Sequence, residues 1–415
     1  MSEVKQKAAL AAARAPQLAW LTSEQKNHAL FAAADALING TEEILKANRE
    51  DLERGRQNGT TAAMLDRLAL NAERIKGMAE GLRQIAELKD PVGEVLETLD
   101  RPNGLHIVKK RVPIGVIGII YEARPNVTVD AAGLCLKTGN AVLLRGGSAA
   151  LSSNIQIAEL FHAALETAGL PKDVLQLVHD SDRSSVDEML KLNGLLDVII
   201  PRGGSSLIQH VVQNASVPVI ETGAGICHTY LDASADLEMA LRIAVNAKAQ
   251  RPSVCNSMET LLIHQHFAGQ YMDRVGEAFK AAGVELRGCK RTRELLSEAK
   301  AATEQDYATE YNDYILNVKI VDDLQQAMDH IAKFGTKHSE CIVTENEELA
   351  ARFQNEVDAA AVYHNASTRF TDGFEFGFGA EIGISTQKLH ARGPMGLSAL
   401  TSTKYIIKGS GQIRG

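Results

Sequence analysis

The stretch Ala141-Val142-Leu143-Leu144-Arg145-Gly146-Gly147-Ser148 decides the fold class of this chain. Four consecutive apolar residues are typical of a buried strand, and the arginine and two glycines form a turn before a helix expected near Ser148 to Ala168. A strand, a glycine turn and a helix in this order build a parallel sheet covered by helices. We therefore predict an α/β protein with ligands at the carboxyl ends of its strands.

The same alternation continues along the chain. Further strands are expected at residues 174–178, 197–200 and 218–220, with helices near Ser184 and Ser205. A second series begins after Glu221. Its expected strands are 259–263, 284–287, 314–321, 341–344 and 359–364, and its expected helices are 236–249, 267–281, 291–301, 324–334 and 347–355. Two such series in 415 residues predict two α/β domains with parallel-rich sheets.

The two ends of the chain differ from this pattern. Residues 2–88 are typical of helices, with caps expected at Ser23 and Thr41. Residues 95–99 and 105–112 are typical of two strands, and this hairpin either leaves the body of the domain or forms an ordinary sheet edge. The glycine-rich tail contains the strand-like residues 404–407, which we expect to dock on another element, with a second subunit as one candidate.

Composition excludes several classes of protein. Hydrophobic residues at 45% and charged residues at 23% are ordinary for a globular protein and exclude disorder or a fibre. A net charge of -8 argues against a nucleic-acid or acidic-membrane partner. Five scattered cysteines without a Cys-x-x-Cys pair argue against a disulfide frame or a metal site. With no apolar signal core and no membrane-length segment, we expect a soluble, cytoplasmic protein.

Cys255 is the strongest candidate for a catalytic residue. It lies in Gln250-Arg251-Pro252-Ser253-Val254-Cys255-Asn256-Ser257, which is too polar for a core segment. A thiolate is a strong nucleophile, and a modestly electropositive setting provides a useful fraction of it at neutral pH. The alternative is a small buried residue that packs as a hydrophobe.

Asn126 is the second candidate. A strand expected at residues 115–120 delivers the turn Tyr121-Glu122-Ala123-Arg124-Pro125-Asn126, which opens a helix. An amide at the end of that strand, together with the backbone N–H of Cys255, has the chemistry to stabilise a developing oxyanion. The alternative is simple capping of the helix by the asparagine.

Two basic glycine turns follow predicted strands. The first consists of Arg145, Gly146, Gly147 and Ser148, and the second of Arg202, Gly203, Gly204 and Ser205. Glycines allow close backbone approach, the helix N-termini favour anions, and the arginines suit ribose hydroxyls or a phosphate. Together they favour a nucleotide site, although the Gly-x-Gly-x-x-Gly fingerprint is absent. A pair of unliganded turns is the alternative.

In this order, the residues around Asn126, Arg145, Gly203, Glu221 and Cys255 resemble the aldehyde dehydrogenase superfamily. Four longer blocks narrow the resemblance to the branch that reduces gamma-glutamyl phosphate. They are residues 250–256, 330–340, 365–373 and 390–397.

The resemblance implies three parts of the chain. They are a cofactor-binding domain at 1–225 interrupted by a β hairpin near 97–112, a catalytic domain at 226–373 with Cys255, and a return segment with a C-terminal β extension at 374–415. The small β extension would serve oligomerisation, so a homo-oligomer is expected. Glutamate 5-kinase is a candidate partner because association would protect the acyl phosphate.

The implied reaction is the reduction of gamma-glutamyl phosphate by NADPH to glutamate 5-semialdehyde and phosphate, in proline biosynthesis. Cys255 would attack the acyl phosphate and hold the acyl group as a thioester while hydride arrives. Arg145 and Arg202 are available for the ribose phosphate of NADP. The rival enzyme is a dehydrogenase that oxidises another small aldehyde to its acid with NAD(P), and the rival from another class is a non-catalytic scaffold with this fold.

Two acids and three arginines complete the expected site. Glu221, beside Gly223, resembles the base that activates water in acid-forming relatives, and here it is either structural or handles protons. Glu310 resembles the carboxylate that touches the nicotinamide ribose, with a solvated acid as the alternative. Bidentate contacts suit the substrate's anions, and the candidates are Arg124, Arg251 and Arg392. His338 is expected in a structural hydrogen-bond network.

Overall fold

The computed structural model describes residues 1–122 and 124–414. Ala123, in the turn before Asn126, and Gly415, at the end of the tail, lie outside the described residues. The chain forms two compact units: unit 1 comprises residues 1–221, 377–383 and 395–415, and unit 2 comprises residues 222–376 and 384–394. The tail is thus shared between the two units.

Unit 1 is built on a four-stranded parallel sheet of order β5-β4-β3-β6. Its strands are β3 (Val116–Tyr121), β4 (Ala141–Arg145), β5 (Leu175–Leu177) and β6 (Val198–Arg202). The helices of this alternating part are α6 (Pro125–Lys137), η1 (Ser148–Ala150), α7 (Leu151–Thr167), η2 (Lys172–Val174), α8 (Arg183–Met189) and α9 (Ser205–Asn214). The predicted strand at residues 218–220 is wrong, because this segment makes only one isolated bridge, between Val219 and Ile199.

Strand register brings three turns to one edge of this sheet. Ile120 of β3 lies opposite Arg145 of β4, and Tyr121 lies opposite Arg202 of β6. All three strands are parallel, so the turns that follow them leave at the same carboxyl edge. The predicted Asn126 turn and both glycine turns are therefore neighbours in unit 1.

Five helices precede the sheet: α1 (Glu3–Leu18), α2 (Ser23–Asn39), α3 (Thr41–Gln57), α4 (Ala62–Leu68) and α5 (Ala72–Glu87). Both predicted caps are wrong by one residue. Thr22 caps α2 in a reciprocal capping box with Gln25, and Gly40 is the N-cap of α3. A Cβ on Gly40 would lie 2.6 Å from a methyl carbon of Leu160, so the close packing against α7 explains a glycine there.

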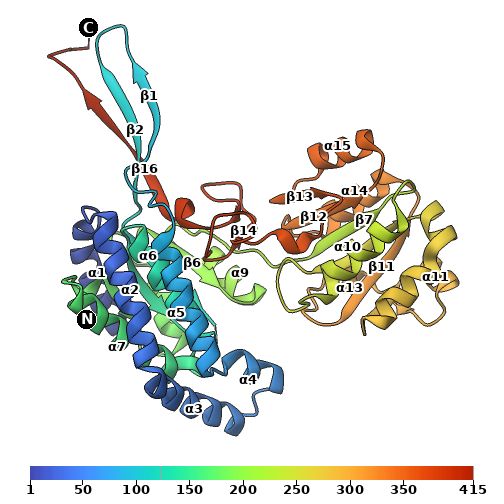
Figure 1. Ribbon diagram of the computed structural model, residues 1–415, viewed down its shortest axis with the longest axis horizontal. Helices are drawn as coiled ribbons and strands as arrows, with labels where there is room; N and C mark the ends of the chain where they lie inside the picture. The colour runs from blue at the N-terminus through green and yellow to red at the C-terminus, as the bar shows by residue number, and fades with distance from the viewer. Residues whose placement is uncertain (123, 415) are drawn as a thin grey trace. The chain divides into compact units, whose positions relative to one another are not determined.

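A separate antiparallel sheet extends from unit 1 (Figure 1). It has the order β1-β2-β16, with bounds β1 (Val95–Asp100), β2 (His106–Pro113) and β16 (Thr401–Lys408). Ile407 pairs with Ile107, so the predicted tail strand docks on the hairpin of its own chain. The hairpin therefore leaves the body of the domain rather than forming an edge of its main sheet.

Unit 2 contains a seven-stranded parallel sheet of order β10-β9-β11-β8-β7-β12-β13. Its strands are β7 (Cys227–Leu231), β8 (Met258–His264), β9 (Glu285–Gly288), β10 (Lys300–Ala301), β11 (Ile315–Val321), β12 (Ser339–Val343) and β13 (Ala361–His364). Its helices are α10 (Leu237–Ala249), α11 (Gln265–Ala281), α12 (Lys290–Leu295), α13 (Glu304–Tyr307), α14 (Leu324–Phe334), α15 (Glu347–Glu356) and η3 (Thr368–Phe370). Short elements of the tail are β14 (Ile384–Ser385), β15 (Gly393–Pro394) and, in unit 1, η4 (Leu397–Leu400).

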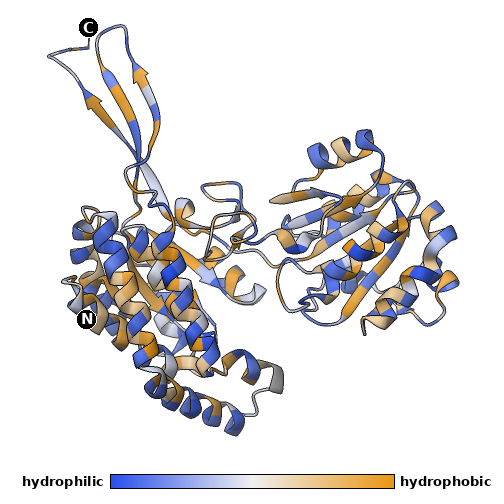
Figure 2. Cartoon of the chain, viewed as in Figure 1, coloured by the Kyte–Doolittle hydropathy of each residue, from blue (hydrophilic) through white to orange (hydrophobic). Residues whose placement is uncertain are grey.

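Successive side chains along the strands of unit 2 point to opposite faces of the sheet, and each face has its own hydrophobic core. Leu261 and Ile263 of β8 pack into one core with α10 and α11, whereas Leu262 packs into the other with α14 and α15. Figure 2 shows hydrophobic residues concentrated along the central strands and hydrophilic residues along the helix surfaces. The predicted helix 291–301 is wrong beyond Leu295, because the chain turns there into β10.

None of the helices in the described part of the chain combines the length and the apolar character that a bilayer crossing requires.

Candidate active site

Cys255 lies in the loop between α10 and β8 of unit 2 and is half-buried. In contrast, Cys135, Cys227 and Cys341 are buried. The interpretation of Cys255 as a small buried core residue is therefore wrong. The loop enters β8 at the amino edge of the parallel sheet.

Two contacts fix the carbonyl of Cys255. The Cys227 thiol donates a hydrogen bond to this carbonyl at 3.2 Å. The second contact is with Gly225, which packs so closely that a Cβ placed on it would fall 1.5 Å from the Cys255 carbonyl oxygen. Only a glycine at residue 225 permits this approach.

Asn256 ties the same loop to η3. Its amide donates to the carbonyl oxygen of Thr371 at 2.9 Å and to that of Arg369 at 3.3 Å. Its own carbonyl accepts a hydrogen bond from the Thr368 hydroxyl at 2.8 Å. The residue after Cys255 is thus held at both its side chain and its backbone, which restricts the orientation of Cys255.

Glu310 contacts Gly225, which packs against the loop of residues 250–257, named the nucleophile loop here after the predicted role of Cys255. Its carboxylate accepts a hydrogen bond from the Gly225 N–H at 3.0 Å and is half-buried. The alternative of a solvated acid is therefore wrong. Contact of Glu310 with a ribose stays a prediction. Within unit 2, the N–H of Gly223 donates to the Ile384 carbonyl at 3.2 Å. Glu221, the last residue of the first segment of unit 1, is half-buried.

A buried polar network lies behind the loop. The His338 Nδ1 lies 3.7 Å from the Cys227 sulfur and 2.8 Å from the Ser339 hydroxyl, which in turn lies 2.6 Å from that of Thr371. Burial lowers the pKa of His338 to about 4, so the ring is neutral at physiological pH. His338 lies in a structural network, as the sequence predicts.

A buried ion pair supports the two elements that flank the loop. Lys248 of α10 and Glu259 of β8 are 2.7 Å apart, and neither side chain exposes more than 1% of its surface. Burial raises the pKa of Glu259 to about 7 and lowers the pKa of Lys248. The carboxylate also accepts the Asn312 N–H at 3.4 Å.

Replacing Lys248 with methionine is expected to lower the free energy of unfolding by about 3–5 kcal/mol, because it leaves the Glu259 carboxyl buried without its partner. Urea denaturation followed by circular dichroism measures the change. The double variant Lys248→Met, Glu259→Leu should recover most of the loss. A single variant as stable as the wild type would contradict this account of the pair.

In unit 1, Asn126 is the second residue of α6, and its side chain is exposed. Its amide donates to the Asp130 carboxylate at 3.1 Å. The N-cap of α6 is Arg124, so the capping interpretation of Asn126 is wrong. Burial raises the pKa of Asp130 to about 6, although the Asn126 hydrogen bond and the charge of Arg202 oppose that rise.

Arg145 is buried at the end of β4 and holds the loop before α8. Its guanidinium donates to the carbonyls of Ser181 at 2.7 Å and Asp182 at 2.9 Å, to the Ser185 hydroxyl and to the Gly146 carbonyl. Four of its five N–H donors are engaged in this way. Arg145 has a structural part in the fold, and its contact with a nucleotide stays a prediction.

The second glycine turn carries an internal anion that the sequence analysis missed. Glu122 accepts a hydrogen bond from the Gly204 N–H at 3.2 Å, at the N-terminus of α9. A Cβ on Gly203 would lie 2.8 Å from the Glu122 carboxyl carbon. A cofactor phosphate at this helix end would have to displace that carboxylate.

The three predicted substrate arginines have different surroundings. Arg392 pairs with Asp358 at 2.6 Å, and its charge lowers the pKa of that carboxyl to about 2, together with Lys388. Arg251, in the nucleophile loop, and Arg124, at the start of α6 in unit 1, are exposed. Their contacts with substrate stay predictions.

Comparison with known proteins assigns the family. The model of the aldehyde dehydrogenase family matches residues 1–293. Gamma-glutamyl phosphate reductases from Clostridium novyi and Moorella thermoacetica are 58% and 59% identical, over 98% and 99% of this chain and of their own lengths. The chain belongs to the gamma-glutamyl phosphate reductases, within the aldehyde dehydrogenase family.

Solved structures agree with this assignment. The crystal structure of the gamma-glutamyl phosphate reductase from Thermotoga maritima matches with a TM-score of 0.97 and 48% identity, covering 100% of both chains. An engineered glycolyl-CoA reductase with bound NADP+ matches at 15% identity with a TM-score of 0.69, covering 97% of this chain and 96% of its own, and shows the fold alone. The predicted aldehyde dehydrogenase-like α/β fold is therefore confirmed. The prediction that the chain is an oxidoreductase is confirmed as well.

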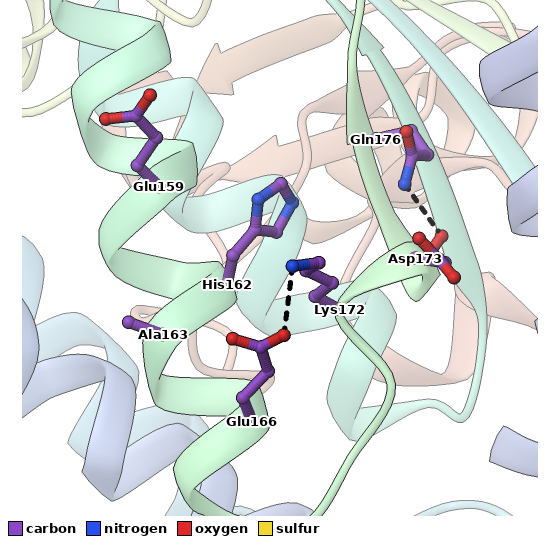
Figure 3. Close-up of a pocket in the computed structure, with 7 residues that line it drawn as sticks. All are labelled: Glu159, His162, Ala163, Glu166, Lys172, Asp173 and Gln176. Carbon is purple, nitrogen blue, oxygen red and sulfur yellow. Dashed lines mark hydrogen bonds and ion pairs between the residues drawn. The ribbon is translucent and has the colours of Figure 1, made fainter.

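A pocket of about 420 Å³ in unit 1 lies away from the predicted nucleotide edge (Figure 3). It lies between α7 and the amino end of β5, whereas the glycine turns leave the sheet at its carboxyl edge. Glu166 and Lys172 pair across it at 3.0 Å, and the His162 Nε2 lies 2.8 Å from the Leu175 carbonyl oxygen. The pocket contains none of the predicted site residues of this reductase.

Proposed function

We propose that this chain catalyses the NADPH-dependent reduction of gamma-glutamyl phosphate to glutamate 5-semialdehyde and phosphate, a step of proline biosynthesis. The observation that carries the proposal is the half-buried thiol of Cys255 on a loop fixed at Gly225, Cys227 and Asn256. Such a loop presents a sulfur nucleophile in one orientation. The two relatives at 58% and 59% identity support the choice of substrate.

The Cys255 thiolate attacks the acyl carbon, the bond to the phosphate oxygen breaks, and inorganic phosphate leaves. A thioester on Cys255 remains. The Asn126 amide and the Cys255 N–H stabilise the negative charge that develops on the carbonyl oxygen. After reduction, the sulfur departs from the hemithioacetal, and the aldehyde and the free thiol are released.

Bound NADPH would supply the hydride that reduces the thioester. The carboxyl edge of the unit 1 sheet suits a nucleotide, since Gly203, Gly204 and Ser148 are exposed there and three parallel strands end side by side. Arg202, half-buried at the end of β6, would hold the ribose phosphate, and Ser148, exposed after β4, the ribose. In this assignment Arg145 does not touch the nucleotide. Instead it fixes the loop before α8, through its hydrogen bonds to the carbonyls of Ser181 and Asp182, at the same edge of the sheet.

Glu221 does not activate water in this proposal, because hydrolysis of the thioester would waste the activated acyl group. Self-association through the β1-β2-β16 sheet is part of the proposal. It is supported by the exposure of Leu96, Tyr405 and Ile407 on that sheet. Association with glutamate 5-kinase is proposed from the lability of the acyl phosphate alone.

Phosphate dependence tests the proposed function. In the reverse direction, the oxidation of glutamate 5-semialdehyde by NADP should require phosphate or arsenate, and the rate should fall by at least about 100-fold without either. NADPH absorbance measures the rate. Oxidation at full rate without an oxyanion would favour the aldehyde-to-acid alternative, with Glu221 as its general base.

A further inference from the structure

Arg369 is a half-buried cation fixed beside the nucleophile by neutral side chains. It belongs to η3, and its Nε donates to the Gln250 side-chain oxygen at 2.8 Å. Another N–H of the guanidinium donates to the Asn256 side-chain oxygen. Gln250 begins the nucleophile loop and Asn256 follows Cys255, so Arg369 bridges the loop on both sides of the thiol.

The charge of Arg369 is poorly compensated. Among the described residues, no carboxylate oxygen lies within ion-pair distance of its guanidinium, whereas Arg287 and Arg392 of the same unit each pair with an aspartate at 2.6 Å. Burial and the like charge of Arg251 lower the pKa of Arg369, and the negative charges of Asp372 and of a Cys255 thiolate oppose that shift.

A half-buried cation close to a second cation costs free energy unless an anion completes the site. Gln250 and Asn256 orient the guanidinium without neutralising it, which leaves the charge available for a ligand. Of the five N–H donors of the Arg369 guanidinium, three remain beyond the bonds to Gln250 and Asn256, enough for a paired contact with an oxyanion. The surroundings therefore suit a negatively charged group next to the Cys255 sulfur.

We propose that Arg369 binds the phosphoryl group of the acyl phosphate while Cys255 attacks the acyl carbon. This inference rests on the proposed function. The phosphoryl oxygen is bonded to the carbon that the sulfur attacks, whereas the α-carboxylate of the glutamyl group lies at the opposite end of the substrate. An arginine tied to both sides of the nucleophile is therefore placed for the phosphate, and it also stabilises the negative charge that the phosphate gains on leaving.

The Michaelis constant for phosphate in the reverse reaction tests this assignment. Arg369→Gln should raise it by about 30- to 100-fold, and Arg369→Lys by about 10-fold, because a lysine retains the charge but not the planar fork. The Michaelis constants for NADP and for the semialdehyde should change by less than about threefold. The matched control is Arg274→Gln, which removes an arginine of α11 that pairs with Glu238.

Gln250→Glu separates ligand binding from structural support. The new carboxylate would keep the bond to the Arg369 Nε and neutralise the guanidinium, so the Michaelis constant for phosphate should rise by about 10-fold. If Arg369 only supports the loop, Gln250→Glu would leave that constant unchanged and Arg369→Gln would impair all three substrates equally. Either result would overturn the inference. A wild-type enzyme that needs no phosphate would instead overturn the proposed function.

Discussion

Replacing Cys255 with alanine will abolish the phosphate-dependent reaction, lowering kcat by about 10⁴- to 10⁶-fold. The reason is that alanine has no sulfur on which the acyl moiety could be held as a thioester. Without that intermediate, hydride would have to reach the acyl phosphate directly. The reverse assay, with glutamate 5-semialdehyde, NADP and phosphate, measures the effect through NADPH absorbance. Cys255→Ser should be almost as inactive, because a hydroxyl yields far less nucleophile at neutral pH.

Cys289 provides the matched control for this experiment. It is the other half-buried cysteine in the described part of the chain, at the N-cap of α12. Burial raises the pKa of the Cys289 thiol, but hydrogen bonds with Thr292 and with backbone groups lower it by more. The net pKa therefore lies below the ordinary value of a cysteine. Cys289 is thus a competing target for alkylation.

Cys289→Ala should retain the wild-type rate. Iodoacetamide should label Cys255 in the native protein, and peptide mapping should show that substrate protects Cys255 and leaves Cys289 unprotected. Activity retained by Cys255→Ala would contradict the proposed role of the thiol. Failure of iodoacetamide to label Cys255 in the native protein would favour the alternative of a non-catalytic scaffold.

Much of the fold follows from local pattern, and the errors have physical causes. Val142 to Leu144 form a continuous apolar run, so the central strand β4 is evident from the sequence. Strand β7 was missed because Cys227-His228-Thr229-Tyr230-Leu231 contains polar groups in a fully buried strand. His228 is tolerated there because the Glu340 carboxylate accepts from its backbone N–H at 2.8 Å and lies 2.9 Å from its ring Nδ1. That partner is more than a hundred residues away, and no local pattern contains it.

In the candidate site, too, some features can be predicted from local sequence and others depend on residues far apart in the chain. The polar loop around Cys255 is visible in the sequence, because its composition alone separates it from the core. Arg369 was missed although its block was recognised, since its significance depends on Gln250 and Asn256, which are distant in sequence. Arg145 illustrates the opposite case. A basic residue at a strand end suggests a ligand contact, but the loop at residues 181–185 engages most of its donors.

Replacing Gly225 with alanine should lower kcat by about 10²- to 10³-fold, although residue 225 takes no part in the chemistry. Its φ lies outside the left-handed region, so alanine can adopt the backbone conformation, and the effect comes from contact alone. The added methyl would fall 1.5 Å from the carbonyl oxygen of Cys255 and 2.7 Å from its Cα, far inside any permitted contact. The nucleophile loop must therefore move.

Movement of the loop would disturb several contacts together. The Cys227 thiol would lose its hydrogen bond to the Cys255 carbonyl, and the Glu310 carboxylate its bond to the Gly225 N–H. In the proposed mechanism the N–H that stabilises the oxyanion belongs to Cys255 itself, so its direction would change with that of the sulfur. Kinetics and thermal melting should therefore show a large fall in kcat with a smaller loss of stability. Gly269→Ala, on α11 where nothing lies within 4 Å of the added methyl, should change neither quantity. A fully active Gly225→Ala enzyme would mean that catalysis does not need the fixed position of the Cys255 loop.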